Sequence, residues 1–268
     1  MEQGKNVELT EENYFSREME QKYTGSTQIK SFLKCEESTL AQINGEYEKE
    51  TSDSMLVSSY LDEKISGTLD KFIAENPEMF TKQGDLKAPY KHVEEIYEKM
   101  LEPRNAMFMK YLSGEKQVIM TGEISGVPVK IKIDSYHEGK CIVDLKCIKD
   151  LNLIWNNDTK QKENFIDYYD YILQGAVYQE IVRQNTGLQL PFIIAVATKE
   201  KEPQFALLQI PQEKMDFKLE FLKSYLPHIQ ELKEGKAIPT SCNSCEYCVS
   251  KKEVNQIFYY DDFFRDRG

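Results

Sequence analysis

The sequence predicts an α/β protein in which helices flank one central sheet. Apolar residues recur with a helical period up to about residue 112, and from Lys116 they alternate with a period of two. Later strand-like segments alternate with long helical ones. We therefore expect a single α/β or α+β domain over residues 1–268, with a mainly helical N-terminal part over 1–112.

The N-terminal part contains three helical segments. Residues 27–40 and 55–74 each carry apolar side chains on one face. A third helix is expected over residues 90–101, and Pro103 stops it.

A catalytic core is expected over residues 116–235. Three strands in succession are predicted at 117–124, 127–139 and 140–148, then a helix over 163–185, strands at 191–199 and 205–211, and a helix over 217–233. A cysteine cluster at 240–250 and an acidic, aromatic tail at 251–268 follow.

Composition narrows the class of protein. Hydrophobic residues make up 40% and charged residues 29% of the chain, which is ordinary for a soluble globular protein. The chain has no apolar run of the roughly 18 residues that span a membrane and no secretory signal at its start, so we expect a cytoplasmic protein with no membrane partner. The net charge of −11 argues against general coating of nucleic acid but allows a local basic groove.

Two carboxylates and a lysine stand out in the first strands. Asp134 closes the segment KIKID, and Asp144 and Lys146 are two apart in IVDLK, so their side chains leave the same face. Such a group suits one or two Mg²⁺ ions, which polarise a phosphodiester and activate water, while the lysine neutralises developing charge. The motif alone equally fits a solvated face on an edge strand.

The helix that follows adds a polar stripe. Tyr171, Gln174 and Tyr178 are three and four residues apart and share one face. A buried glutamine needs several hydrogen-bond partners, which a metal and phosphate site would supply. The alternative is an aromatic core stripe with one satisfied glutamine.

The order D…DxK followed by QxxxY resembles the RecB-like branch of the PD-(D/E)xK nucleases. Here it is written Asp134, Asp144-Leu145-Lys146 and Gln174-Gly-Ala-Val-Tyr178. The resemblance covers most of the chain and is nearest to the phage-borne exodeoxyribonuclease VIII (RecE-type) group, which shares the ending CxxCxYC. It implies a restriction-endonuclease-like mixed sheet flanked by helices.

The resemblance also implies roles for individual residues. Asp134, Asp144 and the carbonyl of Leu145 would bind Mg²⁺ or Mn²⁺, Lys146 would be the catalytic lysine, and Gln174 and Tyr178 would contact the scissile phosphate or DNA end. Asp62 is a further candidate, as a metal ligand or as an anchor for a metal-bound water. Glu123 and Tyr171 are candidate accessory residues.

Three late cysteines have the spacing of metal ligands. Cys242, Cys245 and Cys248 lie at i, i+3 and i+6 in a polar segment, and Cys35 is the candidate for a fourth ligand. The group would hold a [4Fe–4S] cluster, as in some RecB-like nucleases, or Zn²⁺; three free thiols are the open alternative. The last two cysteines, Cys245 and Cys248, are closer together in sequence than the last two cluster ligands of those nucleases.

The function that follows from the resemblance is a metal-dependent exodeoxyribonuclease. It would digest linear duplex DNA for phage-type recombination, with a single-strand annealing protein as partner, and a homo-oligomeric ring is plausible by the same resemblance. The alternative is a catalytically inactive DNA-binding or adaptor protein of the nuclease fold with cysteine-bound metal. Exonuclease or endonuclease action, polarity and oligomeric state are left open by the residues.

Overall fold

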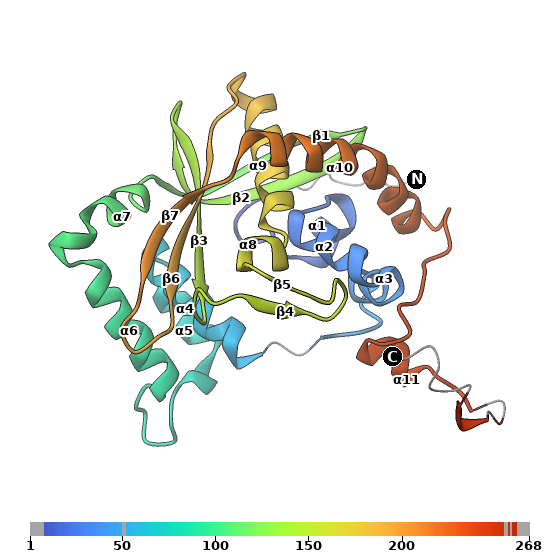
Figure 1. Cartoon of the computed structure of the whole chain (residues 1–268), viewed down its shortest axis with the longest axis horizontal. Coiled ribbons are helices and arrows are strands. Elements are labelled where there is room, and N and C mark those ends of the chain that lie inside the picture. Colours follow the sequence, from blue (N-terminus) through green and yellow to red (C-terminus); the bar gives the residue numbers. More distant parts are fainter. Residues whose placement is uncertain (1–7, 50–51, 255–256, 258, 262–268) are drawn as a thin grey trace.

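A five-stranded mixed sheet runs through the centre of the molecule (Figure 1). The computed structural model describes residues 8–49, 52–254, 257 and 259–261. The strand order is β1-β2-β3-β6-β7, and only β3 and β6 pair in parallel. The strands are β1 (Glu115–Ile124), β2 (Val127–His137), β3 (Cys141–Ile148), β6 (Phe192–Thr198) and β7 (Phe205–Gln209). The predicted α/β class with a central mixed sheet is confirmed.

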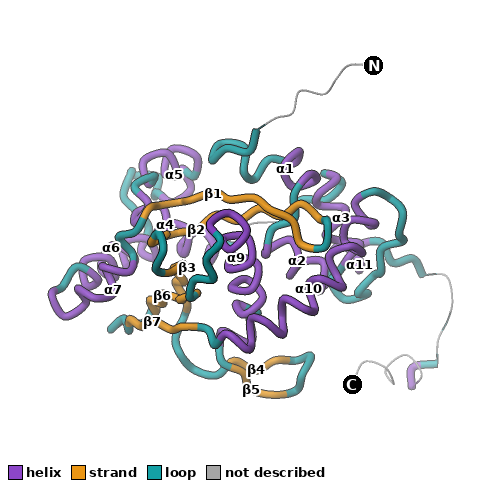
Figure 2. Tube along the Cα trace, turned by 90° about the horizontal axis from the view of Figure 1, so that it is seen from above, coloured by secondary structure: helices purple, strands orange, loops and turns teal. Residues whose placement is uncertain are grey.

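Helices cover both faces of this sheet, and each face has its own apolar cluster. On one face pack α2 (Ser26–Lys34), α9 (Tyr171–Thr186) and α10 (Gln212–Lys233). On the other pack α4 (Asp53–Ser66), α6 (Ala88–Met100) and α7 (Ala106–Tyr111). Figure 2 shows the sheet between these two groups. Both faces of β3 and β6 are therefore apolar, which explains their nearly continuous hydrophobic sequence.

Shorter helices complete the chain. They are α1 (Arg17–Lys22), α3 (Glu36–Asn44), α5 (Leu69–Glu75), α8 (Phe165–Tyr168), α11 (Glu246–Ser250) and two 3₁₀ turns, η1 (Pro77–Met79) and η2 (Pro103–Asn105).

Three predicted helices are each divided in two. The helix expected over 27–40 breaks at Cys35, which has extended backbone and caps both α2 and α3. The helix expected over 55–74 breaks at Gly67 (φ +86°), a left-handed residue that ends α4. The helix expected over 163–185 breaks at Asp170, also left-handed, whose carboxylate caps α9. Apolar periodicity continued across each break, so the sequence predicted uninterrupted helices and was wrong.

A small hairpin was missed by the sequence. Strands β4 (Ile154–Asn156) and β5 (Gln161–Glu163) form a separate two-stranded sheet between β3 and α8. Three-residue strands of mixed polarity give too short a pattern to predict.

The two ends of the chain are only partly described. Residues 1–7 and most of the expected acidic tail (255–256, 258 and 262–268) lie outside the described residues. Among the helices that are described, none combines the length and apolar character needed to cross a membrane.

Candidate active site

The central feature of the site is a point where two strands separate. β2 and β3 pair only at Ser135–Val143 and at the two residue pairs that follow toward the turn. Beyond that point β3 stays paired with β6 on its other side, and the Asp134 carboxylate accepts the Leu145 N–H at 2.8 Å. The side chain of Asp134 thus replaces the missing strand partner. Because β3 is an inner strand, the alternative of an exposed edge strand is wrong.

Asp144 is held at this opening by two partners. Its side chain is 2% exposed; Lys146 Nζ lies 2.5 Å from Oδ2, and Gln174 Nε2 donates to Oδ1 at 2.6 Å. Among the described residues Oδ2 accepts no hydrogen bond of normal geometry despite its burial. Asp144 therefore presents a carboxylate oxygen with unused ligand capacity.

The polar stripe of α9 faces the same opening. The Tyr178 hydroxyl donates to the Lys132 carbonyl at 2.9 Å, fixing α9 against β2. The Tyr171 ring lies between two cations, Lys146 Nζ at 5.0 Å and Lys30 Nζ at 5.1 Å. The structure thus brings the predicted helix residues to the strand carboxylates.

These side chains border one cavity of about 740 Å³. It lies between the sheet, α2, α4, α5 and the segment before α1, and its walls include Asp134, Asp144, Leu145, Lys146 and Asp62. Six carboxylates line it against three lysines; the carboxylates are Glu20, Asp62, Glu63, Glu75, Asp134 and Asp144, and the lysines are Lys130, Lys132 and Lys146. A phosphate would meet excess negative charge here unless cations are also bound.

The carboxylates perturb one another. Burial raises the pKa of Asp134 well above its ordinary value, and the charges of Asp62 and Asp144 raise it further. The pKa of Asp62 rises to about 6, mainly by burial, with Lys146 opposing. For Lys146, burial would lower the pKa, but Asp144 and Asp134 together hold it above the ordinary value. The ammonium therefore stays charged inside the site, while the carboxylates repel one another.

The N-terminal segment forms one wall of the cavity and was missed by the sequence. Lys130, only 1% exposed, pairs with Glu20 Oε1 at 2.7 Å and donates to the Tyr14 carbonyl, so β2 holds this segment in place. The next residue, Phe15, is 72% exposed, and Lys132 Nζ lies 5.0 Å from its ring. The alternation in KIKID places Lys130 and Lys132 on the same face as Asp134, so the sequence could have indicated both lysines. No local pattern indicated that Tyr14 and Phe15 lie at the cavity.

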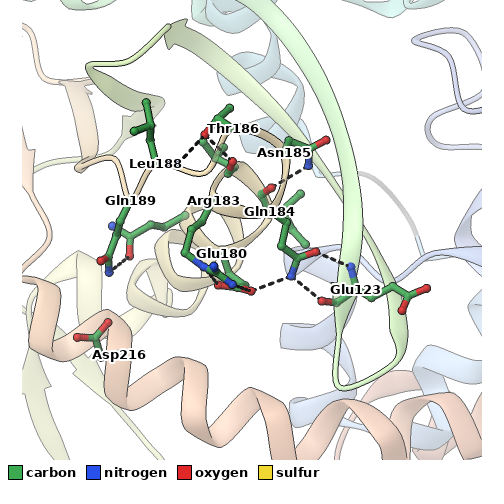
Figure 3. A network of polar contacts seen from close by, with 12 residues as sticks. Glu123, Glu180, Arg183, Gln184, Asn185, Thr186, Leu188, Gln189 and Asp216 are labelled. Atoms are coloured by element: carbon green, nitrogen blue, oxygen red, sulfur yellow. Dashed lines mark hydrogen bonds and ion pairs between the residues drawn. The ribbon is translucent and has the colours of Figure 1, made fainter.

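Glu123 lies away from this cavity. It is an exposed residue near the tip of the β1–β2 hairpin, and its backbone N–H and carbonyl bond to the side chain of Gln184 on α9 (Figure 3). The Glu123 carboxylate is not among the groups that line the cavity. The structure therefore separates Glu123 from the other predicted site residues.

The four predicted cysteines form a second centre. Cys35, Cys242, Cys245 and Cys248 place their sulfurs within 4.8 Å of one another, and within the described part of the chain they are the only such group of three or more potential metal ligands. Burial raises the pKa of Cys35 to about 12, whereas for Cys242 the N–H groups of Ser244 and Cys245 outweigh burial and lower the pKa to about 6. A metal would be needed to hold four thiolates so close together.

Comparisons with known proteins bear on the fold and family of the chain. The model of a family described as a PDDEXK-like domain of unknown function matches residues 25–251. A crystal structure of a "Putative exonuclease" from Eubacterium rectale superposes with a TM-score of 0.90 at 40% sequence identity, over 97% of this chain and 99% of that one. The search of curated proteins gives no match. The matched range 25–251 spans the segments that carry the strand carboxylates, the α9 stripe and the four clustered cysteines.

Proposed function

The chain belongs to the family of PDDEXK-like domains, and from that premise we propose that it is a metal-dependent deoxyribonuclease with Asp134, Asp144 and Lys146 at its active centre. The observation that carries the proposal is the separation of β2 from β3, which opens a cavity where these three groups meet. A nuclease fold with a decayed site would not be expected to keep them in contact.

The residues fit a divalent cation. Asp134 and Asp144, with Asp62 from α4, supply hard oxygen ligands from three separate elements. Oδ2 of Asp144 is buried with Lys146 as its ion-pair partner, and burial with the neighbouring carboxylates raises the pKa of Asp134, so a cation bound here would relieve the repulsion between the carboxylates. Leu145 directs its N–H toward Asp134, and since the N–H and C=O of one strand residue point to the same side, its carbonyl faces the same gap. A bound Mg²⁺ or Mn²⁺ would polarise the phosphodiester and activate water.

The chain's own side chains orient the reaction. Lys146 keeps a positive charge beside Asp144 and stabilises the negative charge that develops on the phosphoryl oxygens. Gln174 fixes the orientation of the Asp144 carboxylate through its 2.6 Å hydrogen bond. The Tyr178 hydroxyl already donates a hydrogen bond to the Lys132 carbonyl, so we propose that it holds α9 against β2. It could contact the phosphate only if it gave up this hydrogen bond.

DNA is the substrate that the cavity walls favour. Lys132 on β2 lines the cavity with its ammonium near the Phe15 ring, and Lys30 lies over the Tyr171 ring next to it, so both can meet a phosphate, whereas the buried Lys130 is already paired with Glu20. The exposed ring of Phe15 at the cavity wall offers a surface on which a base can stack. We propose exonuclease action on linear duplex DNA, a choice supported by the name of the Eubacterium rectale relative.

The wider role is proposed from the resemblance. We infer that the enzyme produces single strands for a phage-type recombination system in the cytoplasm, with a single-strand annealing protein as partner and a ring of identical subunits around the DNA. Light scattering of the purified chain with and without duplex DNA, and copurification with a candidate annealing protein, test these two statements.

The central experiment compares linear with covalently closed circular duplex DNA in Mg²⁺, using wild type, Asp144→Asn and Asp85→Asn. Asp85 is an exposed aspartate outside the cavity and serves as the matched control. We expect wild type and Asp85→Asn to degrade linear DNA only, and Asp144→Asn to lose at least about 100-fold in rate. Equal activity of folded Asp144→Asn would refute the site; cleavage of circles would refute exonuclease action.

A further inference from the structure

The cysteine group joins two parts of the chain that are far apart in sequence. Cys35 lies at the junction of α2 and α3, whereas Cys242, Cys245 and Cys248 lie on the segment that leads through α11. Cys35 and Cys248 are 213 residues apart, yet their sulfurs are 3.5 Å apart. What the group binds determines how the two ends are held.

The spacing of the sulfurs bears on which metal group they can hold. A zinc ion bound by four thiolates has Zn–S bonds of about 2.3 Å in a tetrahedron, which places the sulfurs about 3.8 Å from one another. The sulfurs of Cys242 and Cys248 are 3.9 Å apart, those of Cys245 and Cys35 are also 3.9 Å apart, and all four lie within 4.8 Å. One small ion fits at the centre of this arrangement.

A [4Fe–4S] cluster does not fit the same arrangement. In such a cluster each thiolate binds a different iron at a corner of a cube, and irons and sulfides lie between the thiolates. The four cysteine sulfurs must then stand farther apart than four sulfurs that share a single ion. The close grouping of the four sulfurs therefore favours a single ion over a cubane, which would require the side chains to move apart.

We propose that Cys35, Cys242, Cys245 and Cys248 bind one structural zinc ion, and that the iron–sulfur cluster implied by resemblance to some RecB-like nucleases is absent from this chain. All four ligand positions are filled by protein, which is the pattern of a structural rather than a catalytic zinc site.

Backbone N–H groups point at two of the four sulfurs. The backbone N–H of Ser38 points to Cys35 Sγ at 3.4 Å, and that of Cys245 points to Cys242 Sγ at 3.2 Å. Nearby, Lys251 pairs with Glu37 at 3.0 Å. Backbone N–H groups directed at sulfur stabilise negative charge there and fix the orientation of the ligands.

The surrounding chain holds the cysteines together independently of metal. Glu36, 8% exposed, accepts the Thr240 N–H and hydroxyl, each at 2.8 Å, and His228 Nε2 lies 2.9 Å from its other oxygen. This contact fixes the chain just before Cys242 next to Cys35. The contacts of Glu36 with Thr240 and with His228 thus hold the late cysteines beside Cys35.

The zinc would act on the cavity through α2. Cys35 ends that helix by donating its N–H to the Ser31 carbonyl, and Ser26, Thr27 and Ser31 of the helix line the active-site cavity. Fixing Cys35 therefore fixes one wall of the cavity. The metal itself lies outside the cavity lining and has no part in the chemical step.

The test is the metal content of the full chain, purified under reducing conditions after growth with both zinc and iron. We expect about one zinc per chain, no iron and no visible absorption, and visible bands of tetrahedral cobalt thiolate after Co²⁺ exchange. In Cys245→Ser the bound zinc should fall at least about tenfold. Cys147→Ser is the matched control, because Cys147 lies outside the group, and it should keep its zinc.

Iron and sulfide in place of zinc would overturn the proposal, and so would a wild-type chain that binds neither Zn²⁺ nor Co²⁺. Because wild type alone decides between these outcomes, a poorly folded Cys245→Ser does not weaken the test. Asp144→Asn should keep its zinc while losing nuclease activity, so failure of the zinc site and failure of the nuclease assignment are distinguishable.

Discussion

At the scale of single residues, Asp134 has two tasks. Its carboxylate accepts the Leu145 N–H where β2 leaves β3, and it also borders the cavity beside Asp144. Sequence could predict that Asp134, Asp144 and Lys146 converge, because their spacing is local. It could not predict the backbone contact, which exists only because the strands separate.

Replacing the site lysine should remove activity without unfolding the chain. Lys146→Met eliminates the positive charge that stabilises the phosphoryl oxygens, and we expect the rate on linear duplex DNA to fall at least about 100-fold. The side chain of Lys149 is 94% exposed, so Lys149→Met is the control. A Lys146→Met enzyme of normal rate, with a native circular dichroism spectrum, would remove Lys146 from the mechanism.

The buried carboxylates should make the metal-free protein less stable at high pH. Because the pKa of Asp62 is raised to about 6 and that of Asp134 is raised further above its ordinary value, the folded state binds protons more tightly than the unfolded state. Their contribution is fully present below about pH 4 and is lost as pH rises through 6 and beyond.

Thermal melts in a chelator should therefore give a Tm that falls between pH 5 and pH 8, and Mg²⁺ should raise Tm more at pH 8 than at pH 5. In Asp62→Asn the fall should be smaller. A Tm that stays level over this range in wild type, with or without Mg²⁺, would contradict the predicted repulsion.

At the scale of elements, α9 approaches the sheet closely through Gly175. A Cβ at this position would lie 2.8 Å from the ring of Phe192 and 3.1 Å from the sulfur of Met215. The close approach brings the neighbouring Gln174 to Asp144. The sequence allowed the stripe of α9 to be predicted from its spacing, but the depth of the helix depends on this one missing side chain.

Gly175→Ala should lower the free energy of unfolding. Overpacking costs about 1–3 kcal/mol, and the better helix propensity of alanine returns about 1 kcal/mol, so we expect a net loss of about 1 kcal/mol. Urea denaturation measures it. Gly25→Ala is the control for added volume, since its Cβ would meet nothing closer than 3.7 Å, and it should lose only the roughly 0.5 kcal/mol by which alanine is the poorer N-cap of α2. A Gly175→Ala protein more stable than wild type would contradict the prediction and mean that Phe192 and Met215 can move to accept the added methyl group.

The segment before α1 should contribute to substrate binding. Phe15→Ala removes the exposed ring at the cavity wall, and we expect KM for linear DNA to rise about 5- to 150-fold with kcat little changed, because one stacked base contributes about 1–3 kcal/mol. Phe217, which is 77% exposed on α10 and outside the cavity lining, provides the control Phe217→Ala. A fall confined to kcat would mean that Phe15 acts elsewhere. The sequence did not predict that the segment before α1 lines the cavity, because its contact with β2 joins residues more than a hundred positions apart.

At the scale of the whole molecule, the net charge of −11 opposes the approach of a polyanion, so the proposed binding of DNA would depend on cations. Six carboxylates line the cavity against three lysines. The flanking of a central sheet by helices could be predicted from periodicity, because the apolar period changes from helical to alternating along the chain. The sequence could not predict which lysines lie beside the cavity carboxylates, because the contacts that bring them there join residues far apart in the chain.

Calcium should permit binding without cleavage. Ca²⁺ accepts the same oxygen ligands in a looser geometry than Mg²⁺. Fluorescence anisotropy with labelled linear duplex should give a Kd at least about tenfold tighter in Ca²⁺ than in EDTA. The gain should vanish in Asp134→Asn/Asp144→Asn and persist in Asp85→Asn. Equal gains in both variants would mean that the cation acts by general screening rather than in the cavity.

The meeting of Cys35 with Cys248 also changes the topology of the molecule. With one ion between them, the chain from the end of α2 to α11 becomes a closed loop of more than two hundred residues. A single cut by a protease at the exposed turn after β4 would open the loop without releasing either fragment. While the ion stays bound, closure would also restrict the opened chain, by an amount that grows only slowly with loop length. The proposed zinc would thus hold the two ends of the chain together at a point remote from the chemistry.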